Sequence, residues 1–155
     1  MAENKKKFLL DENLGKLAKW LRMLGYDATV YKSISIEKKI SLCKKERRIF
    51  LTRSKKIARK KEKFSRILIR TEKYDEQLQE IIHLIEFDNE MLSSRCLECN
   101  YKLQELQVEK IKDIIPENVK HNFSNFKICR KCGKIFWKGS HYSAMKSKLK
   151  NLLTT

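Results

Sequence analysis

The sequence lacks any apolar segment long enough to cross a membrane, which takes about 20 consecutive apolar residues. The first ten residues also lack the apolar stretch of a secretory signal peptide. Acidic residues are scarce, because 19 Asp and Glu stand against 36 Lys and Arg, and the formal net charge is +17. We therefore expect a soluble, cytoplasmic protein with no membrane partner.

The excess of positive charge is spread along the chain. Residues 1–92 carry a formal net charge of +9, and residues 93–155 carry +8. A cationic surface of this extent suits a polyanion such as RNA or DNA, bound through its phosphates. The alternative is a lysine-rich composition that only keeps the protein soluble. Arginine and aromatic residues interleaved with lysine over residues 130–142 favour a nucleic acid.

Cysteine is also infrequent, but its arrangement is informative. Four of the five cysteines form two Cys-x-x-Cys pairs, Cys96/Cys99 and Cys129/Cys132. Two such turns complete a tetrahedral four-sulfur shell, the closed geometry of structural zinc. Asn100 and Gly133, which follow the pairs, tolerate the left-handed backbone of a metal-binding turn. Disulfide bonds are the alternative, which a reducing cytoplasm disfavours.

The first part of the chain, residues 1–90, alternates short apolar runs with amphipathic stretches. The runs that predict strands are residues 8–10, 28–31, 49–52 and 67–69. The stretches that predict helices are residues 14–24, 35–46, 54–63 and 75–87. This alternation predicts an α/β domain in which helices flank a parallel sheet.

The composition changes after Asp88, and residues 91–155 show no such alternation. This part contains both cysteine pairs, the single proline Pro116 between them, and a basic helix predicted over residues 143–153. We expect a small four-cysteine zinc ribbon that depends on its metal, because its apolar content is low. The predicted organisation is two domains, residues 1–90 and 91–155.

Functional sites of open parallel sheets form at the carboxyl ends of the strands, where several loops converge. Asp11 directly follows the first predicted strand, Arg53 follows the third, and Asp75 opens the fourth helix. Carboxylates gathered at this edge would hold Mg²⁺ or Mn²⁺, which can drive hydrolysis of a phosphodiester bond. The alternative for Asp11 is to cap the helix that begins near Leu14.

Residues 8–27, which run from Phe8-Leu-Leu-Asp-Glu to Gly-Tyr-Asp27, resemble the opening of the Mut-seven carboxy-terminal ribonuclease domain, a PIN-like family. Residues 51–53, the paired cysteine turns and residues 137–142 are similar to later landmarks of that family, in the same order. The resemblance implies a PIN-like α/β nuclease domain followed by a zinc ribbon. It also implies metal-dependent cleavage of RNA at clustered acidic residues.

The chain departs from the family pattern at two of the expected acidic positions. Asp11 matches the first acid, but Ile36 and Ser54 stand where two others are expected. Glu37 would replace the acid at Ile36 only if its helix were turned, because one residue rotates a helical side chain by about 100°. The candidate catalytic residues are therefore Asp11, Glu37 and Asp75. The alternative function is a non-catalytic RNA-binding adapter on a degenerate PIN-like scaffold.

Basic and aromatic side chains predict an RNA-binding face that does not depend on catalysis. The candidates are Lys16, Lys19 and Arg22 on the first helix, Arg53 after the third strand, and Arg130, Lys134, Trp137, Lys138 and His141 around the second cysteine pair. Cations bind phosphates, and rings stack on unpaired bases. For Trp137 the alternative is a place in the small core of the ribbon. The identity of the RNA and the oligomeric state stay open.

Overall fold

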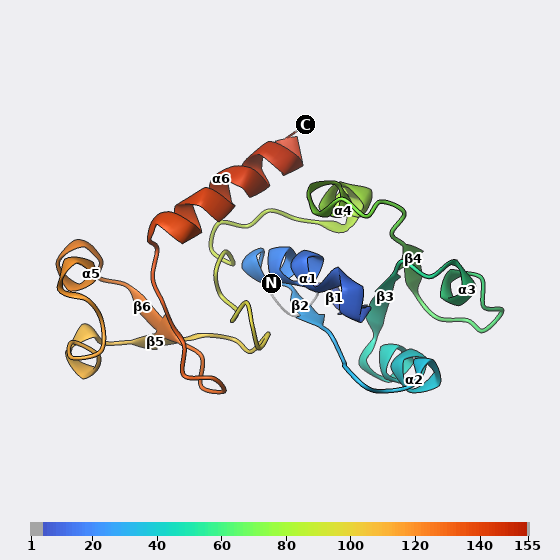
Figure 1. The fold of residues 1–155 in the computed structure, drawn as a ribbon, viewed down its shortest axis with the longest axis horizontal. Helices are drawn as coiled ribbons and strands as arrows, with labels where there is room; N and C mark the ends of the chain where they lie inside the picture. Colours follow the sequence, from blue (N-terminus) through green and yellow to red (C-terminus); the bar gives the residue numbers. More distant parts are fainter. Residues whose placement is uncertain (1–4, 155) are drawn as a thin grey trace.

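A four-stranded parallel sheet forms the centre of the first part of the chain in a computed structural model, which describes residues 5–154. The strands are β1 (Lys7–Leu10), β2 (Asp27–Thr29), β3 (Arg48–Thr52) and β4 (Arg66–Leu68). They lie in the order β2-β1-β3-β4, and every neighbouring pair is parallel. The predicted parallel sheet flanked by helices is confirmed (Figure 1).

The helices of this part are α1 (Gly15–Met23), α2 (Ile36–Glu46), α3 (Lys55–Ala58) and α4 (Tyr74–Glu80). Two of them are shorter than the sequence predicts. Residues 59–63 are all charged, so they offer no apolar side chain that would hold a longer α3 against the core. After α4 the chain changes to a 3-10 turn at Ile82–Leu84.

The sheet is covered on both faces because its strands alternate their side chains. Phe8 and Leu51 belong to a core cluster that includes α1 and α4. Leu9 and Phe50 belong to a second cluster that includes α2 and α3. All four side chains have no exposed surface. Functional side chains must therefore come from the ends of the strands and the loops beyond them.

Two helix ends follow the expected local chemistry. Gly25 follows α1 with φ 90°, and a Cβ at this position would lie 2.6 Å from the carbonyl oxygen of Met91. Ser35 precedes α2 with extended backbone, and its hydroxyl accepts a hydrogen bond of 3.1 Å from the backbone N–H of Lys38.

A small antiparallel sheet forms the second part. Its strands are β5 (Gln104–Leu106), β6 (Phe126–Ile128) and β7 (Ile135–Phe136), in the order β5-β6-β7. A 3-10 turn at Val108–Lys110 and α5 (Glu117–Asn122) lie between β5 and β6. The small core consists of Ile111, Ile115, Val119 and Phe126. Trp137 packs against this core, and the centre of its ring lies 6.2 Å from the centre of the Phe126 ring.

The last helix, α6 (Ser140–Thr154), leaves the small sheet and crosses back over the first part of the chain (Figure 1). Leu149 is fully buried in the same cluster as Leu17 of α1 and Leu78 of α4. Lys148 Nζ lies 2.8 Å from Asp75 Oδ1 at the start of α4. We call residues 5–90 the body and residues 91–139 the ribbon; α6 shares the core of the body.

Candidate functional site

Asp11 lies at the carboxyl end of β1. Its backbone N–H donates to the carbonyl oxygen of Leu51 at 3.2 Å, so the pairing of β1 with β3 continues to this residue. Its Oδ2 accepts a hydrogen bond from the hydroxyl of Thr52, a side chain with no exposed surface. The Asp11 side chain makes no capping hydrogen bond to the short helical turn that follows. The carboxylate is thus fixed at the sheet edge by a neighbouring strand.

The other acidic candidates belong to the helices that follow this edge. Glu37 is exposed in the first turn of α2, directly after Ile36. Asp75 is exposed in the first turn of α4 and forms the ion pair with Lys148. Ser54 caps α3, because its hydroxyl accepts a hydrogen bond of 3.3 Å from the backbone N–H of Ile57. Ser54, which stands where the family pattern has an acid, therefore acts as the N-cap of α3.

These acids do not form a joint ligand set for a divalent ion. Within the described range 5–154, the one group of three or more Cys, His, Asp or Glu side chains close enough to share an ion is the four-cysteine cluster. Mg²⁺ is held in many sites through one or two carboxylates, several waters and substrate phosphates. Asp11 alone offers such an ion one carboxylate, so the chain by itself does not fit a complete magnesium or manganese site.

The four cysteines do come together. Their Sγ atoms all lie within 4.8 Å of one another, and those of Cys96 and Cys132 are 3.8 Å apart. The two turns are alike: the N–H of Asn100 donates to Cys96 O at 2.9 Å, and that of Gly133 donates to Cys129 O at 2.8 Å. Asn100 and Gly133 have φ values of 69° and 76°, the predicted left-handed conformation. Four clustered sulfurs are the donor set of a closed zinc site.

The thiols of this cluster differ in acidity. Burial raises the pKa of Cys96, and burial followed by hydrogen bonding with Cys132 raises the pKa of Cys99 to about 12. Burial also acts to raise the pKa of Cys129, but hydrogen bonds from the backbone of Cys132 and Lys131 outweigh it and lower the value to about 7. A metal ion binds thiolates, so loading the site would release the remaining protons.

Arg22, a predicted RNA contact, is only 8% exposed and faces the ribbon. Its guanidinium donates to the carbonyl oxygens of Ala28 at 2.8 Å and Leu97 at 2.7 Å. The spacing of α1 correctly placed Arg22 away from the leucines, but the first cysteine turn covers that side. Arg22 therefore links the first cysteine turn to the body, and its contact with RNA stays a prediction.

A second junction between body and ribbon lies at Asn100. Its Nδ2 donates to Asp27 Oδ1 at 2.7 Å, and its Oδ1 accepts from the N–H of Ala28 at 3.0 Å. Arg48 also contacts Asp27, with Nη1 and Oδ1 2.7 Å apart. Burial acts to raise the pKa of Asp27, but the hydrogen bonds from Arg48 and Asn100 outweigh it and hold this pKa below its usual value. No sequence pattern indicates this junction, because its residues are distant along the chain.

Four predicted RNA contacts meet in a groove between α1, the ribbon and α6. The groove has a volume of about 460 Å³, and its lining includes Lys19, Lys134, Trp137, His141 and Tyr142. Lys134 and His141 are exposed, and the Trp137 ring is partly buried. The groove therefore combines cations and rings, as single-stranded nucleic acids require.

The remaining predicted contacts lie outside this groove. Lys16 Nζ is 3.8 Å from the ring centre of Tyr74, which places α1 next to the start of α4. Arg130 Nε donates to Gln104 Oε1 at 2.8 Å within the ribbon. Lys138 is exposed beside the groove. The predicted contacts thus form several groups rather than one continuous face.

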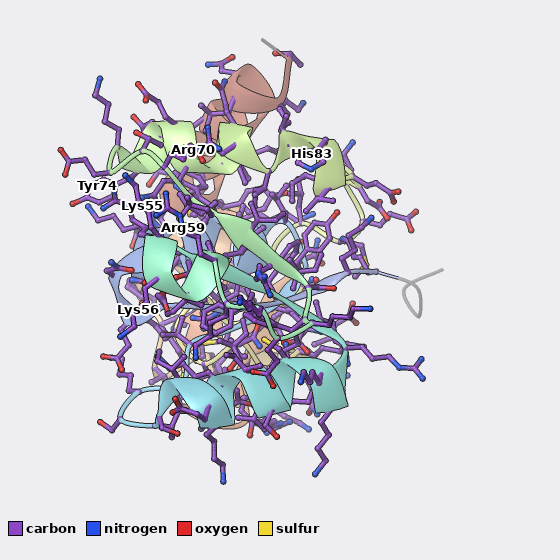
Figure 2. All side chains as sticks on the ribbon, turned by 90° about the vertical axis from the view of Figure 1, so that its right-hand side faces the viewer. Lys55, Lys56, Arg59, Arg70, Tyr74 and His83 are labelled. Atoms are coloured by element: carbon purple, nitrogen blue, oxygen red, sulfur yellow. The ribbon has the colours of Figure 1, made fainter. Side chains whose placement is uncertain are left out.

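Arg53 begins another basic group, at the carboxyl ends of β3 and β4. It lines a cavity together with Lys55, Arg59 and Arg70 (Figure 2). The sequence placed Arg53 at this edge but missed Arg59, because α3 was expected to continue beyond it. For Arg70 the sequence did contain a signal, because this basic residue directly follows the fourth predicted strand.

The fold and site define an α/β protein with an acidic residue at the carboxyl edge of its sheet and an attached four-cysteine module. Residues 6–149 match the family described as the Mut7-C RNAse domain. The chain therefore belongs to this ribonuclease domain family. Comparisons with curated proteins and with solved structures returned no match.

Of the helices within residues 5–154, none has the length and apolar character needed to cross a membrane.

Proposed function

We propose that this chain binds RNA along the carboxyl edge of its parallel sheet and cleaves it through Asp11. The observation that carries the proposal is the Asp11 carboxylate, held by Thr52 at the end of a buried strand. Membership of the ribonuclease family supports RNA as the substrate. The cations around Arg53 support it as well, because they lie after the neighbouring strand of the same edge.

Asp11 has the chemistry to orient an attacking hydroxyl and accept its proton. The hydrogen bond from Thr52 keeps its carboxylate in one orientation. The side chain of Arg53 carries a fixed positive charge, which would offset negative charge that develops on the phosphate. Glu37 and Asp75 are proposed as helpers of Asp11 and not as a preformed site.

A second candidate function is an RNA-binding adapter without catalysis. Ile36 cannot bind a cation, and Ser54 is occupied as the cap of α3. No acidic cluster forms around Asp11 in the described part of the chain. These observations favour an adapter in which the fold and the basic surface are retained.

For the ribbon we propose one structural zinc ion held by Cys96, Cys99, Cys129 and Cys132. Four sulfur ligands would close the shell of the metal and leave no position for substrate or water. The metal would then hold the groove residues in place and take no part in cleavage.

The test of the proposed function is cleavage of labelled single-stranded and structured RNA by the full chain. Reactions without added divalent ion, with Mg²⁺ and with Mn²⁺ compare the wild type with Asp11→Asn. We expect cleavage by the wild type and a loss of at least about 100-fold in the variant, the usual contribution of a general base. Asp113→Asn, which removes an equal charge from an exposed site in the ribbon, should cleave normally.

Two results separate the candidates. RNA binding without cleavage under all three conditions would eliminate the ribonuclease and leave the adapter. Equal cleavage by the wild type and Asp11→Asn would show that the reaction does not use this carboxylate.

A further inference from the structure

A basic cavity of about 570 Å³ lies one strand away from Asp11. Its lining consists of Arg53, Lys55, Arg59, Leu68, Ile69 and Arg70. Arg53 and Arg70 follow the carboxyl ends of β3 and β4, and the other two cations come from α3 and its end. Figure 2 shows Lys55, Arg59 and Arg70 gathered at this end of the sheet, with His83 well apart from them.

The four cations of the cavity form no ion pair in the part of the chain that the structure describes. Glu80 lies nearby, but its two carboxylate oxygens accept hydrogen bonds of 2.8 Å from the backbone N–H groups of Arg70 and Thr71. The lining therefore contains four positive charges and no acidic side chain.

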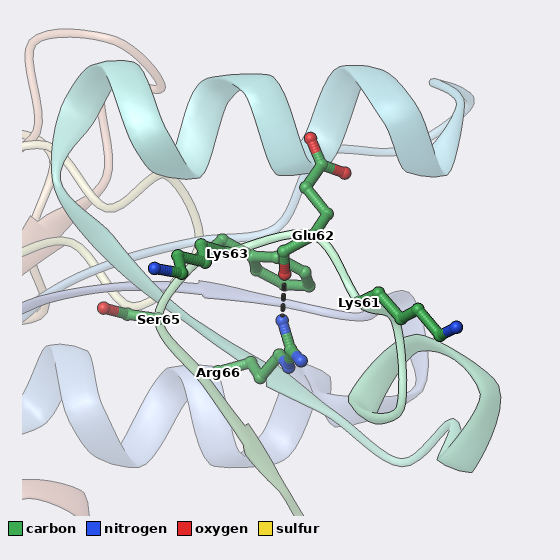
Figure 3. A pocket seen from close by; sticks show the side chains of 6 residues that line it. Lys61, Glu62, Lys63, Ser65 and Arg66 are labelled. Carbon is green, nitrogen blue, oxygen red and sulfur yellow. Dashed lines mark hydrogen bonds between the residues drawn. The ribbon is translucent and has the colours of Figure 1, made fainter.

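Arg66, the first residue of β4, has a guanidinium that is held by backbone carbonyl groups. It donates to the carbonyl oxygens of Ala58 at 3.0 Å and Glu62 at 2.7 Å, and also to that of Lys60. Figure 3 shows the hydrogen bond to Glu62. Arg53 differs: its Nη2 donates to the carbonyl oxygen of Arg70 at 3.2 Å, and its buried Nε makes no hydrogen bond within residues 5–154. The guanidinium of Arg53 is therefore less fully hydrogen-bonded by the described chain than that of Arg66.

We propose that this cavity binds the phosphate monoester at one end of an RNA strand. A terminal phosphate carries about two negative charges at neutral pH and three acceptor oxygens, whereas a phosphodiester within the strand carries one charge. Arginine recognises such a group through paired, charge-assisted hydrogen bonds. The inference rests on the proposed function, because it assumes that RNA binds at the edge that contains Asp11. The chain would then recognise the ends of RNA strands.

The test measures binding by Asp11→Asn without added divalent ion, so that cleavage cannot interfere. One short single-stranded RNA sequence is used with a 5′-phosphate, with a 3′-phosphate, or with hydroxyls at both ends. We expect one of the phosphorylated RNAs to bind about tenfold more tightly than the RNA with hydroxyl ends, the effect of one good charge-assisted contact. Which of the two is preferred identifies the strand end.

Two further variants connect the preference to the cavity. Replacing Arg59 and Arg70 together by Gln should abolish it, while Arg47→Gln should preserve it. Arg47 is exposed at the amino end of β3, the opposite edge of the sheet. Its replacement by Gln lowers the net charge of the chain by one. Equal affinity for all three RNAs, or a preference that survives the double variant, would overturn the inference. Loss of all RNA binding by the Asp11→Asn protein would instead contradict the proposed function.

Discussion

The side chain of Asp27 in β2 connects the sheet with the first cysteine turn. Its carboxylate bonds to Arg48 of β3 and to Asn100, which follows Cys99. Because these contacts favour the ionised form, the pKa of Asp27 in the folded protein lies below its unfolded value. The contribution to stability is therefore complete above the unfolded pKa and is lost as the pH falls through the folded pKa.

We predict that Asp27→Asn lowers the free energy of unfolding by roughly 1–3 kcal/mol at pH 7, the usual value of a hydrogen bond to a charged group. Arg48 keeps its ion pair with Glu46 in this variant. The difference from the wild type should shrink below about pH 4, where the unfolded carboxyl is protonated. Denaturant unfolding of both proteins from pH 7 to pH 3 measures this. A difference that is constant over that range would show that the charge of Asp27 contributes nothing.

The two cysteine turns are the elements whose role is most clearly linked to an ion. We predict about one zinc ion per chain, lost in Cys96→Ser, because a closed site needs all four sulfurs. Elemental analysis measures the zinc content, and near-ultraviolet circular dichroism reports the packing of the Trp137 ring. Cys43→Ser is the matched control, since Cys43 of α2 is buried in a separate cluster with Leu9 and Phe50. Full zinc content in Cys96→Ser would eliminate the four-sulfur site.

Helix α6 belongs to the core of the body although it follows the ribbon, and this packing can be tested separately. Leu149→Ala removes a fully buried side chain and should cost about 2–5 kcal/mol of stability. Lys150→Ala, at the exposed neighbouring position, should change stability by less than about 0.5 kcal/mol. Thermal unfolding of the two variants measures the difference. Equal stability would mean that α6 does not pack on the body.

The elements that sequence reasoning predicted correctly are those governed by local chemistry. Apolar runs identified all four strands of the body, Ser35 identified the start of α2, and the cysteine spacing identified the two turns. Two features that the sequence did not indicate depend on contacts between distant segments. Arg22 is buried by the ribbon, and α6 packs on the body. The periodicity of apolar residues within one helix does not indicate which distant segment packs against it.

At the scale of the whole molecule, the net charge of +17 favours RNA, and the number of phosphates that the chain contacts determines how RNA binding responds to salt. Phosphate contacts release counterions from the strand, so affinity should fall steeply as the salt concentration rises. We predict that the double replacement of Arg59 and Arg70 by Gln reduces the slope of log affinity against log salt by about 1.4, because each phosphate contact to a single strand contributes about 0.7. Filter binding over a series of salt concentrations measures the slope.

A control for this prediction is Arg47→Gln, which changes the net charge by one without touching the carboxyl edge. Its slope should equal that of the wild type. An equal reduction per removed charge in both variants would mean that RNA responds to total charge and not to the cavity.

The central claim is that RNA lies along the carboxyl edge of the parallel sheet. Photochemical crosslinking of single-stranded RNA to the full chain, followed by identification of the crosslinked peptides, tests it most directly. We predict crosslinks within residues 11–16, 53–59 and 70–74, which surround Asp11 and the basic cavity. Crosslinks confined to residues 5–7 and 46–48, at the opposite edge of the sheet, would contradict it.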